Sequence, residues 1–305
     1  GTPINPSALA IDTKGHGLVF GFTNGKLLGF FVQDPYKGQL TPGTPVATTA
    51  SPINKIVFHP SLDRIYFING MSGGTDNIYV YTFDKSSGAL AFLASAHPSN
   101  NLAINDMAIS PTGNYLFVST AQSGGKSLFA FPLDGAGLLG TATDNSTSGN
   151  GSFATGFMAI SSDGQYLYAQ KTTNVITRYN IGGAANLGSV SAADSPAGFP
   201  GPITALILDK TNTILFVGDS SGIITPVVPA TAAMNGGVSS SCGAPVTSLS
   251  VSPDNSALFC TSSNAGSNFY FYTFDALGTM SAFANSPWTV GSGNKQFSFM
   301  GIFQP

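Results

Sequence analysis

The stretch SPTGNYLFVS, residues Ser110–Ser119, joins a tight-turn sequence to a run of strand-forming residues. Related phrases recur as SSDGQYLYAQ from Ser161 and as SPDNSALFCT from Ser252, each after a short apolar segment. In every copy Pro, Asp, Gly or Asn lies where a tight turn accepts it, and the residues that follow favour a β-strand. The phrase therefore predicts a β-hairpin that is remade at intervals along the chain.

These turns recur with a steady period. The apolar residues that precede them lie 43 to 51 residues apart, at Ile11, Phe58, Ile109, Ile160, Leu208, Val251 and Ile302. A regular period of this length is typical of a repeat architecture. Each period holds four strand-like pieces, which in the second repeat are residues 54–60, 64–70, 77–84 and 89–95.

Four consecutive antiparallel strands form one blade of a β-propeller, in which the sheets stand radially around a central channel. The third piece of the second repeat, NIYVYTF at 77–83, is largely apolar at both sets of alternating positions. A strand that is buried on both faces has this pattern, and a sheet with two apolar faces packs between two neighbours. We therefore predict an all-β fold, a β-propeller of four-stranded antiparallel blades.

The number of blades stays open. Six repeats are complete, and a seventh inner-strand segment ends the chain at GIFQP, residues 301–305. This count favours six blades in a single propeller domain over residues 1–305. A C-terminal strand at 297–303 would close the ring, because a terminal segment can cover an edge that is otherwise exposed. Residues 7–12 compete for the same inner position.

The composition favours strands and excludes several classes of function. Only 8% of the residues are charged, and the 14 acidic residues are all Asp, which leaves little material for exposed helices. The net charge is −3, whereas nucleic-acid binding needs a positively charged stripe. No apolar run reaches the roughly 18 residues of a transmembrane helix. We expect no nucleic-acid partner and no transmembrane segment.

The surface residues point to export. A charge-poor composition rich in Ser, Thr, Gly and Asn is typical of exported bacterial proteins, so we expect an extracytoplasmic location, whether periplasmic, cell-surface or secreted. The chain starts at Gly1 without Met, which indicates a processed or a trimmed N-terminus and leaves an export signal open. Cys242 and Cys260 are either disulfide-bonded or two buried thiols. If residues 246–252 and 257–262 form a hairpin, Cys260 lies opposite position 249, and Cys242 must fold back from the preceding linker.

Several segments together resemble a known family. They are SPTGNYLFVS, SPDNSALF, DKSSGAL (84–90), NSPWTVGSG (285–293) and NPSALAID (5–12). In the pattern of these repeated segments the chain resembles the lactonase-like β-propellers. That family is related to propeller-type 6-phosphogluconolactonases and to bacterial surface-protein propeller repeats. The resemblance implies seven blades and hydrolysis of a lactone ring at the mouth of the channel.

The resemblance also implies a catalytic pattern that this sequence lacks. Catalytic members have a Pro-His pair where an inner strand starts, with acidic and basic partners nearby. The matching positions here read PSA (6–8), INK (53–55), IND (104–106), ATG (154–156), PIT (202–204), PVT (245–247) and FSF (297–299), none with His.

The sequence contains no clear motif for metal binding, phosphate binding or calcium binding. His16, His59 and His97 do not have the spacing of metal ligands, so we interpret them as structural or solvent-exposed and expect no metal and no cofactor. The Gly-rich stretches 70–74 and 122–126 lack the spacing of a phosphate loop. Asp residues at the turns are expected to bond their own backbone two residues on. The stretch TDNSTSGNGS, 143–152, lacks the regular ligand alternation of a calcium loop.

The best candidate for ligand binding follows from the propeller geometry. The starts of the inner strands crowd one end of the channel, so polar groups there converge although they are distant in sequence. Asn54 with Lys55, and Asn105 with Asp106, occupy equivalent starts in successive repeats. We predict that these four residues form a binding site. Nearby loops would add Lys26, Lys126, Lys171 and Asp219, and the alternative is a simple salt bridge or a solvated rim.

Three functions compete. The first is an exported binding module that holds an unknown small molecule, carbohydrate or protein at the channel mouth. The second is a metal-independent lactone hydrolase acting on a sugar or related lactone, in which Lys and Asp polarise and activate water toward a carbonyl. The third is a structural scaffold. The missing His and the scarcity of charge favour binding, because lactone opening needs a base and an oxyanion partner.

Overall fold

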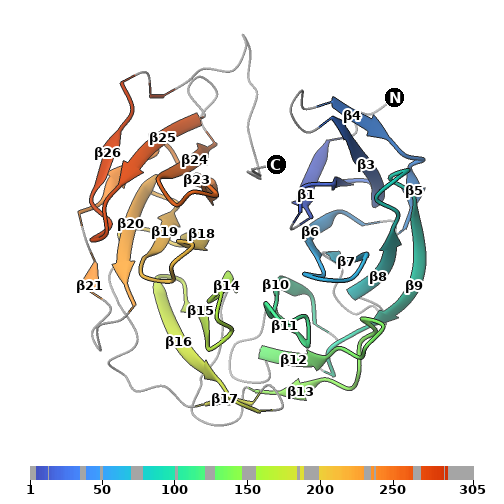
Figure 1. Ribbon diagram of the computed structural model, residues 1–305. Helices are drawn as coiled ribbons and strands as arrows, with labels where there is room; N and C mark the ends of the chain where they lie inside the picture. Colours follow the sequence, from blue (N-terminus) through green and yellow to red (C-terminus); the bar gives the residue numbers. More distant parts are fainter. Residues whose placement is uncertain are drawn as a thin grey trace. The chain divides into compact units, whose positions relative to one another are not determined.

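The computed structural model describes most of the 305 residues as strands and short connections (Figure 1). The described residues are 5–12, 14–34, 39–48, 51–69, 78–99, 102–120, 128–145, 156–183, 186–188, 199–229, 235–236, 238–263, 269–284 and 286–287. They fall into two compact units. The first consists mainly of residues 1–156, and the second mainly of residues 157–181 and 188–302.

The first unit contains three antiparallel sheets, each with its strands side by side in chain order (Figure 1). Sheet 1 consists of β1 (Pro6–Ile11), β2 (Gly17–Phe22), β3 (Lys26–Asp34) and β4 (Gln39–Pro42), with β5 (Val46–Ala47) also paired to β3. Sheet 2 consists of β6 (Ile53–Phe58), β7 (Arg64–Asn69), β8 (Ile78–Phe83) and β9 (Leu90–Ala96). Sheet 3 consists of β10 (Ile104–Ile109), β11 (Tyr115–Thr120), β12 (Leu128–Pro132) and β13 (Thr143–Asp144).

Three further sheets have the same strand order and belong mainly to the second unit. Sheet 4 consists of β14 (Met158–Ile160), β15 (Tyr166–Thr172), β16 (Val175–Ile181) and β17 (Leu187–Gly188). Sheet 5 consists of β18 (Ile203–Leu208), β19 (Leu215–Asp219), β20 (Ile223–Val228) and β21 (Asn235–Gly236), with β22 (Ser240–Ser241) also paired to β20. Sheet 6 consists of β23 (Val246–Val251), β24 (Ala257–Ser262), β25 (Phe269–Phe274) and β26 (Met280–Ala282).

The prediction of an all-β chain built from four-stranded antiparallel blades is confirmed. Six such sheets and no α-helix occur within the described residues, and the strands of sheet 2 begin and end within one or two residues of the predicted pieces. The seventh inner-strand segment near Ile302 and the predicted closing strand at 297–303 lie outside the described residues. The single-domain organisation and the ring closure therefore stay predictions.

The repeated phrase has a local physical cause. In three turns a serine directly after the inner strand accepts, through its Oγ, the backbone N–H five residues later. The pairs are Ser110 with Tyr115 at 3.0 Å, Ser161 with Tyr166 at 2.9 Å and Ser252 with Ala257 at 2.8 Å. Asp12 and Asp209 do the same with a carboxylate oxygen. The side chain satisfies a donor that the tight turn would otherwise leave unpaired.

Sheet 2 is buried on both faces. On one face Ile53, Ile56 and Phe67 pack against Val19 and Leu27 of sheet 1, and on the other Tyr66, Ile68 and Val80 pack against Met107 and Val118 of sheet 3. Burial of both faces explains why β8 is largely apolar at every position, as predicted. A Cβ atom at Gly21 would lie 2.6 Å from Ile53, so glycine lets sheet 1 approach sheet 2 closely.

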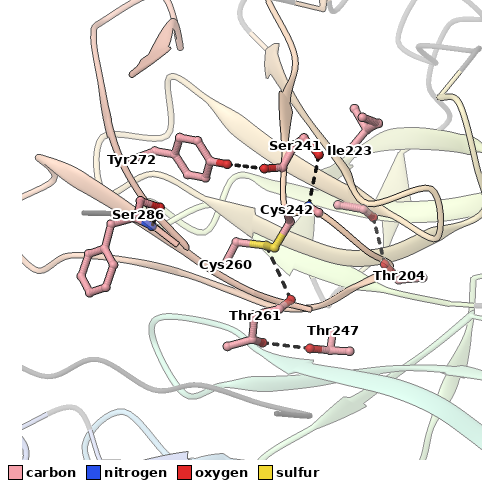
Figure 2. Close-up of a disulfide and its surroundings, with 12 residues drawn as sticks. Thr204, Ile223, Ser241, Cys242, Thr247, Cys260, Thr261, Tyr272 and Ser286 are labelled. Atoms are coloured by element: carbon pink, nitrogen blue, oxygen red, sulfur yellow. Dashed lines mark hydrogen bonds between the residues drawn. A yellow bond between two sulfur atoms is a disulfide. The ribbon is translucent and has the colours of Figure 1, made fainter. Parts of the chain in front are cut away.

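A disulfide joins sheets 5 and 6 within the second unit (Figure 2). Cys260 lies on β24 opposite Leu249, as predicted, and Cys242 follows β22, with a Cα–Cα distance of 6.3 Å between the two cysteines. Both cysteines are fully buried among apolar side chains of the two sheets. The bonded alternative is therefore the one that the fold adopts, and the bond fastens two neighbouring blades.

Candidate functional site

The predicted site residues lie on β-bulges at the start of two inner strands. In sheet 2 the pairing of β6 with β7 shifts between Ile53 and Lys55, and in sheet 3 the pairing of β10 with β11 shifts between Ile104 and Asp106. Asn54 and Asn105 are the extra residues at these shifts. A bulge re-aims the side chains beside it and often occurs next to a functional site.

The same bulge recurs in both units. Pairing shifts occur at equivalent places in sheets 1, 5 and 6, where the extra residues are Ser7, Thr204 and Thr247. All five extra residues carry a hydroxyl or an amide, which are hydrogen-bonding groups that suit polar ligands. Sequence analysis found the two asparagines by their position but not the bulges, because a bulge adds one residue without changing the repeat phrase.

Lys55 and Asp106 form a direct ion pair between sheets 2 and 3. The Nζ atom of Lys55 lies 2.7 Å from Oδ1 of Asp106, and the side chains are 40% and 5% exposed. The same Oδ1 accepts the backbone N–H of Met107 at 2.9 Å. A buried carboxylate needs such partners to offset its lost hydration. The ammonium has three N–H donors, and the contact with Asp106 uses one of them.

A second polar layer lies beside the bulges, and Asp219 is its only member that was named from the sequence. The last residues of β7, β11, β19 and β24 are polar and at most 1% exposed, and they are Asn69, Thr120, Asp219 and Ser262. Each pairs with the inner-strand residue that precedes the bulge. The signal that could have found the other three is a polar residue that ends an otherwise apolar second strand in several repeats.

Two members of this layer show contrasting environments. The Asp219 carboxylate accepts backbone N–H groups of Ser221 at 2.8 Å, Ile223 at 3.0 Å and Gly201 at 3.1 Å, which closes the turn after β19. Neither polar atom of the Asn69 amide has a hydrogen-bond partner in the part of the chain that the structure describes. Asn69 pairs with Ile53, which packs toward sheet 1, so it lies on the opposite face of sheet 2 from Lys55.

The other predicted loop residues do not contact the ion pair in any described interaction. Lys26 begins β3 of sheet 1, Lys171 lies in β15 and Asp219 ends β19 in the second unit. Lys126 and the Gly-rich stretches 70–74 and 122–126 lie outside the described residues. Of the eight residues, the structure brings Lys55 and Asp106 into contact and places Asn54 and Asn105 next to them in sequence on matching bulges.

The three histidines have different surroundings. His59 is buried and its Nδ1 accepts the backbone N–H groups of Ser61 and Leu62 at 3.2 and 3.0 Å, so it caps a turn. The side chain of His16 is 58% exposed and lies 3.8 Å from Asp12, and His97 contacts the carbonyl of Pro98 at 3.0 Å. Within the described ranges, no cluster of three or more His, Cys or acidic residues is arranged to hold a metal ion.

Asp residues at the turns bond their own backbone, as predicted. The carboxylates of Asp84, Asp134 and Asp275 accept the N–H groups of Ser86, Ala136 and Leu277, two residues on, at 2.8 to 2.9 Å. Hydrogen bonds from the hydroxyls of Ser87 and Ser86 hold the pKa of Asp84 down at about 2. These carboxylates belong to the turns and not to the candidate site. The stretch 143–152, which lacks the ligand pattern of a calcium loop, falls mostly outside the described residues.

In the described residues, the structure contains no helix long and apolar enough to cross a membrane.

A family model described as "Lactonase, 7-bladed beta-propeller" matches residues 67–227, which is more than half of the chain. No curated protein sequence matches the chain.

Solved structures show the same fold at low sequence identity. A periplasmic gluconolactonase from Pseudomonas aeruginosa is 18% identical with a TM-score of 0.75, and the match covers 95% of this chain and 87% of that chain. A putative 6-phosphogluconolactonase from Bacteroides fragilis is 14% identical with a TM-score of 0.74, covering 97% and 86%. Sqt1 from Chaetomium thermophilum, bound to the N-terminus of ribosomal protein L10, is 17% identical with a TM-score of 0.65, covering 90% and 72%.

Proposed function

Because the chain belongs to the lactonase family of seven-bladed β-propellers, we propose that it binds a sugar-like small molecule at the bulges of sheets 2 and 3. The binding residues are Asn54, Lys55, Asn105 and Asp106. One observation carries the proposal: an ion pair of 2.7 Å links two equivalent bulges, with a partly exposed ammonium above a buried carboxylate. Fixed charges and amides on rigid strands suit a ligand rich in hydroxyl groups.

The geometry favours binding over hydrolysis. A general base must be reached by water, whereas the Asp106 side chain is only 5% exposed and its Oδ1 accepts hydrogen bonds from both Lys55 Nζ and Met107 N. The ammonium of Lys55 is therefore the group presented to a ligand, where it donates to a carboxylate or a carbonyl oxygen. An ammonium that binds substrate and transition state equally well gives affinity without acceleration.

Lactone hydrolysis is the second candidate. The family description and the names of two structural neighbours favour it, since those neighbours are called gluconolactonase and 6-phosphogluconolactonase. In this alternative Lys55 stabilises the developing oxyanion, and Asp106 accepts a proton from water after it exchanges its hydrogen bond with Lys55.

The binding proposal is tested by calorimetry with three probes: gluconate, glucono-1,5-lactone and glucose. We expect saturable binding of at least one probe, with a loss of more than ten-fold in affinity for Lys55→Ala and for Asn105→Ala. Lys14→Ala is the matched control, because Lys14 is exposed at the β1–β2 turn of the same unit. Absence of binding by all three probes, or equal loss in the control, would overturn the proposal and favour a structural scaffold.

Turnover decides between the two candidates. Acid release from glucono-1,5-lactone is followed above the spontaneous rate for the wild type, Asp106→Ala and Lys55→Ala. The proposal expects no acceleration in any of them. Acceleration that either substitution abolishes would establish the hydrolase instead.

An extracytoplasmic location is part of the proposal. The bonded Cys242 and Cys260 support it, because disulfides persist in oxidising compartments and are rare in the cytosol. Fractionation of the source cells with immunodetection of the chain tests this location. Recovery of the chain in the cytosolic fraction with two alkylatable thiols would contradict it.

A further inference from the structure

Asn69, the last residue of β7, carries a buried amide without a protein partner. The residue is 0% exposed, and neither its Oδ1 nor its Nδ2 has a hydrogen-bond partner in the part of the chain that the structure describes. Because the donor and the acceptor end are both unpaired, turning the amide over does not supply a partner. Buried polar side-chain atoms nearly always have one, so this amide indicates a group that is bound there.

The equivalent residues of three other sheets obtain their partners within the protein. Asp219, at the end of β19, accepts three backbone N–H groups at 2.8 to 3.1 Å. Thr120 and Ser262, at the ends of β11 and β24, also have interaction partners. Asn69 shares their position in the blade but differs from them in its bonding. The position alone therefore does not explain why the amide of Asn69 is unpaired.

The surroundings of Asn69 favour a neutral occupant. Asn69 pairs with Ile53, the first residue of β6, which packs in the apolar cluster between sheets 1 and 2. Among the described residues of these two sheets, the buried acidic and basic side chains are Asp12 and His59. Both lie at the other end of the inner strands, just after β1 and β6. An ion beside Asn69 would lose its hydration without a counter-charge to offset the cost.

We propose that Asn69 is the recognition group of a second polar site, on the sheet 1 side of sheet 2, and that this site binds a hydroxyl group. A hydroxyl is neutral, and it both donates and accepts, as the two ends of the amide require. The Oγ of Ser7 donates to the carbonyl of Ile53 at 2.7 Å, so sheet 1 adds a hydroxyl beside the residue that pairs with Asn69. The bound hydroxyl belongs either to an internal water molecule or to a small polyol. The site lies on the opposite face of sheet 2 from Lys55 and does not depend on the sugar-binding proposal.

Nuclear magnetic resonance identifies the occupant in the full chain. Selective labelling of asparagine nitrogen shows the side-chain NH₂ groups, and the signal of Asn69 is the one that disappears in Asn69→Leu. We expect a nuclear Overhauser contact with the sign of a long-lived complex from this NH₂ group, either to water in plain buffer or to the carbon-bound protons of isotopically labelled glycerol. The first result assigns water and the second assigns a polyol.

Three outcomes of this experiment decide the proposal. The contact should persist in Lys55→Ala, so that failure of the sugar-binding proposal leaves this result unchanged. An NH₂ group of Asn69 that contacts neither water nor glycerol would overturn the proposal. Loss of the contact in Ser7→Ala would trace it to exchange through the serine hydroxyl and would overturn the proposal as well.

A second experiment uses the sign of a change in the thermal unfolding midpoint. If the amide were unpaired in an apolar interior, Asn69→Leu, which has nearly the same shape, would remove two unpaired atoms and raise the midpoint. A bound hydroxyl pairs with the amide, so its loss in Asn69→Leu should lower the midpoint by roughly 2–4 °C. Asn145→Leu is the matched control, because the buried Asn145 amide accepts the N–H of Leu187 at 3.0 Å and its loss should lower the midpoint in either case. A higher midpoint for Asn69→Leu would contradict the proposal.

Discussion

The Nε2 atom of His59 lies 3.1 Å from the carbonyl oxygen of Gly113, 54 residues further along the chain. His59 Nδ1 accepts two backbone N–H groups, so the proton of the neutral ring is on Nε2, which donates to Gly113. His59 therefore caps the β6–β7 turn of sheet 2 and also links it, through this hydrogen bond, to the β10–β11 turn of sheet 3. Serine caps the equivalent turns at 110, 161 and 252 and is too short to do this.

Acid should weaken this link. Burial lowers the pKa of His59 below 6.5, assisted by the charge of Arg64 and opposed by the hydrogen bond to Gly113. Between the lowered pKa and 6.5 the unfolded chain binds more protons than the folded chain, so stability falls as pH falls through this window. Urea unfolding at pH 7.5 and 5.5 should show a smaller loss for His59→Ser than for the wild type. Equal losses would contradict this role.

Gly113 should tolerate no side chain. Its φ is +73°, and a Cβ atom there would collide with the His59 ring. Gly113→Ala should lower the free energy of unfolding by about 1–3 kcal/mol, through backbone strain and the displaced ring. Gly135→Ala is the control, since no atom lies within 4 Å of its Cβ position, and it should be neutral within about 0.5 kcal/mol. Thermal unfolding of both variants tests the difference.

Asn255 should stabilise the fold both through its side-chain hydrogen bonds and through its tolerance of a positive φ. Its Oδ1 accepts the N–H of Lys210 at 2.7 Å and its Nδ2 donates to Asp209 at 3.0 Å, which joins the turns of sheets 5 and 6, and its φ is +60°. Asn255→Gly removes the side-chain hydrogen bonds, but glycine adopts the positive φ without strain. This variant should lower the free energy of unfolding by about 1–2 kcal/mol. Asn255→Ala should lower the free energy of unfolding by about 1 kcal/mol more than Asn255→Gly, because alanine is strained at this positive φ. Chemical denaturation that ranks Ala above Gly in stability would refute this.

The disulfide should stabilise the second unit. Closing the loop from Cys242 to Cys260, a sequence separation of 18, contributes about 3 kcal/mol in chain-entropy terms. The double variant Cys242→Ala/Cys260→Ala should unfold at a lower temperature than the wild type. Dithiothreitol should lower the wild-type midpoint toward that of the double variant and leave the double variant unchanged. A reductant effect in the double variant would point to another cause.

Much of the fold could be predicted because each repeat contains a turn and strands that are recognisable from a short local sequence. The turn phrases that begin at Ser110, Ser161 and Ser252 recur since every inner hairpin needs a residue that caps its turn. The strand pieces of the second repeat were placed within one or two residues because β8 is apolar at both alternating sets. The turn aspartates were also predictable, since the bond from Asp to the N–H two residues on is local.

The candidate site was only partly predictable. Repeat alignment placed Lys55 and Asp106 at equivalent starts of inner strands, and the structure brings them to 2.7 Å. The bulges at Asn54 and Asn105 and the buried Asn69 were not foreseen. A bulge depends on how two strands pair, and burial depends on the neighbouring sheet, so neither leaves a fixed mark in the spacing of residues.

By itself the sequence determined the period, the strands, the turns and the all-β blade, because these depend on contacts between residues close together in the chain. Only the tertiary structure decided that Cys242 bonds Cys260, that His59 and Asn255 fasten neighbouring turns, and that Lys55 pairs with Asp106. These contacts join different repeats. Their geometry follows from how closely packed sheets face one another, which the order of residues along one repeat does not specify.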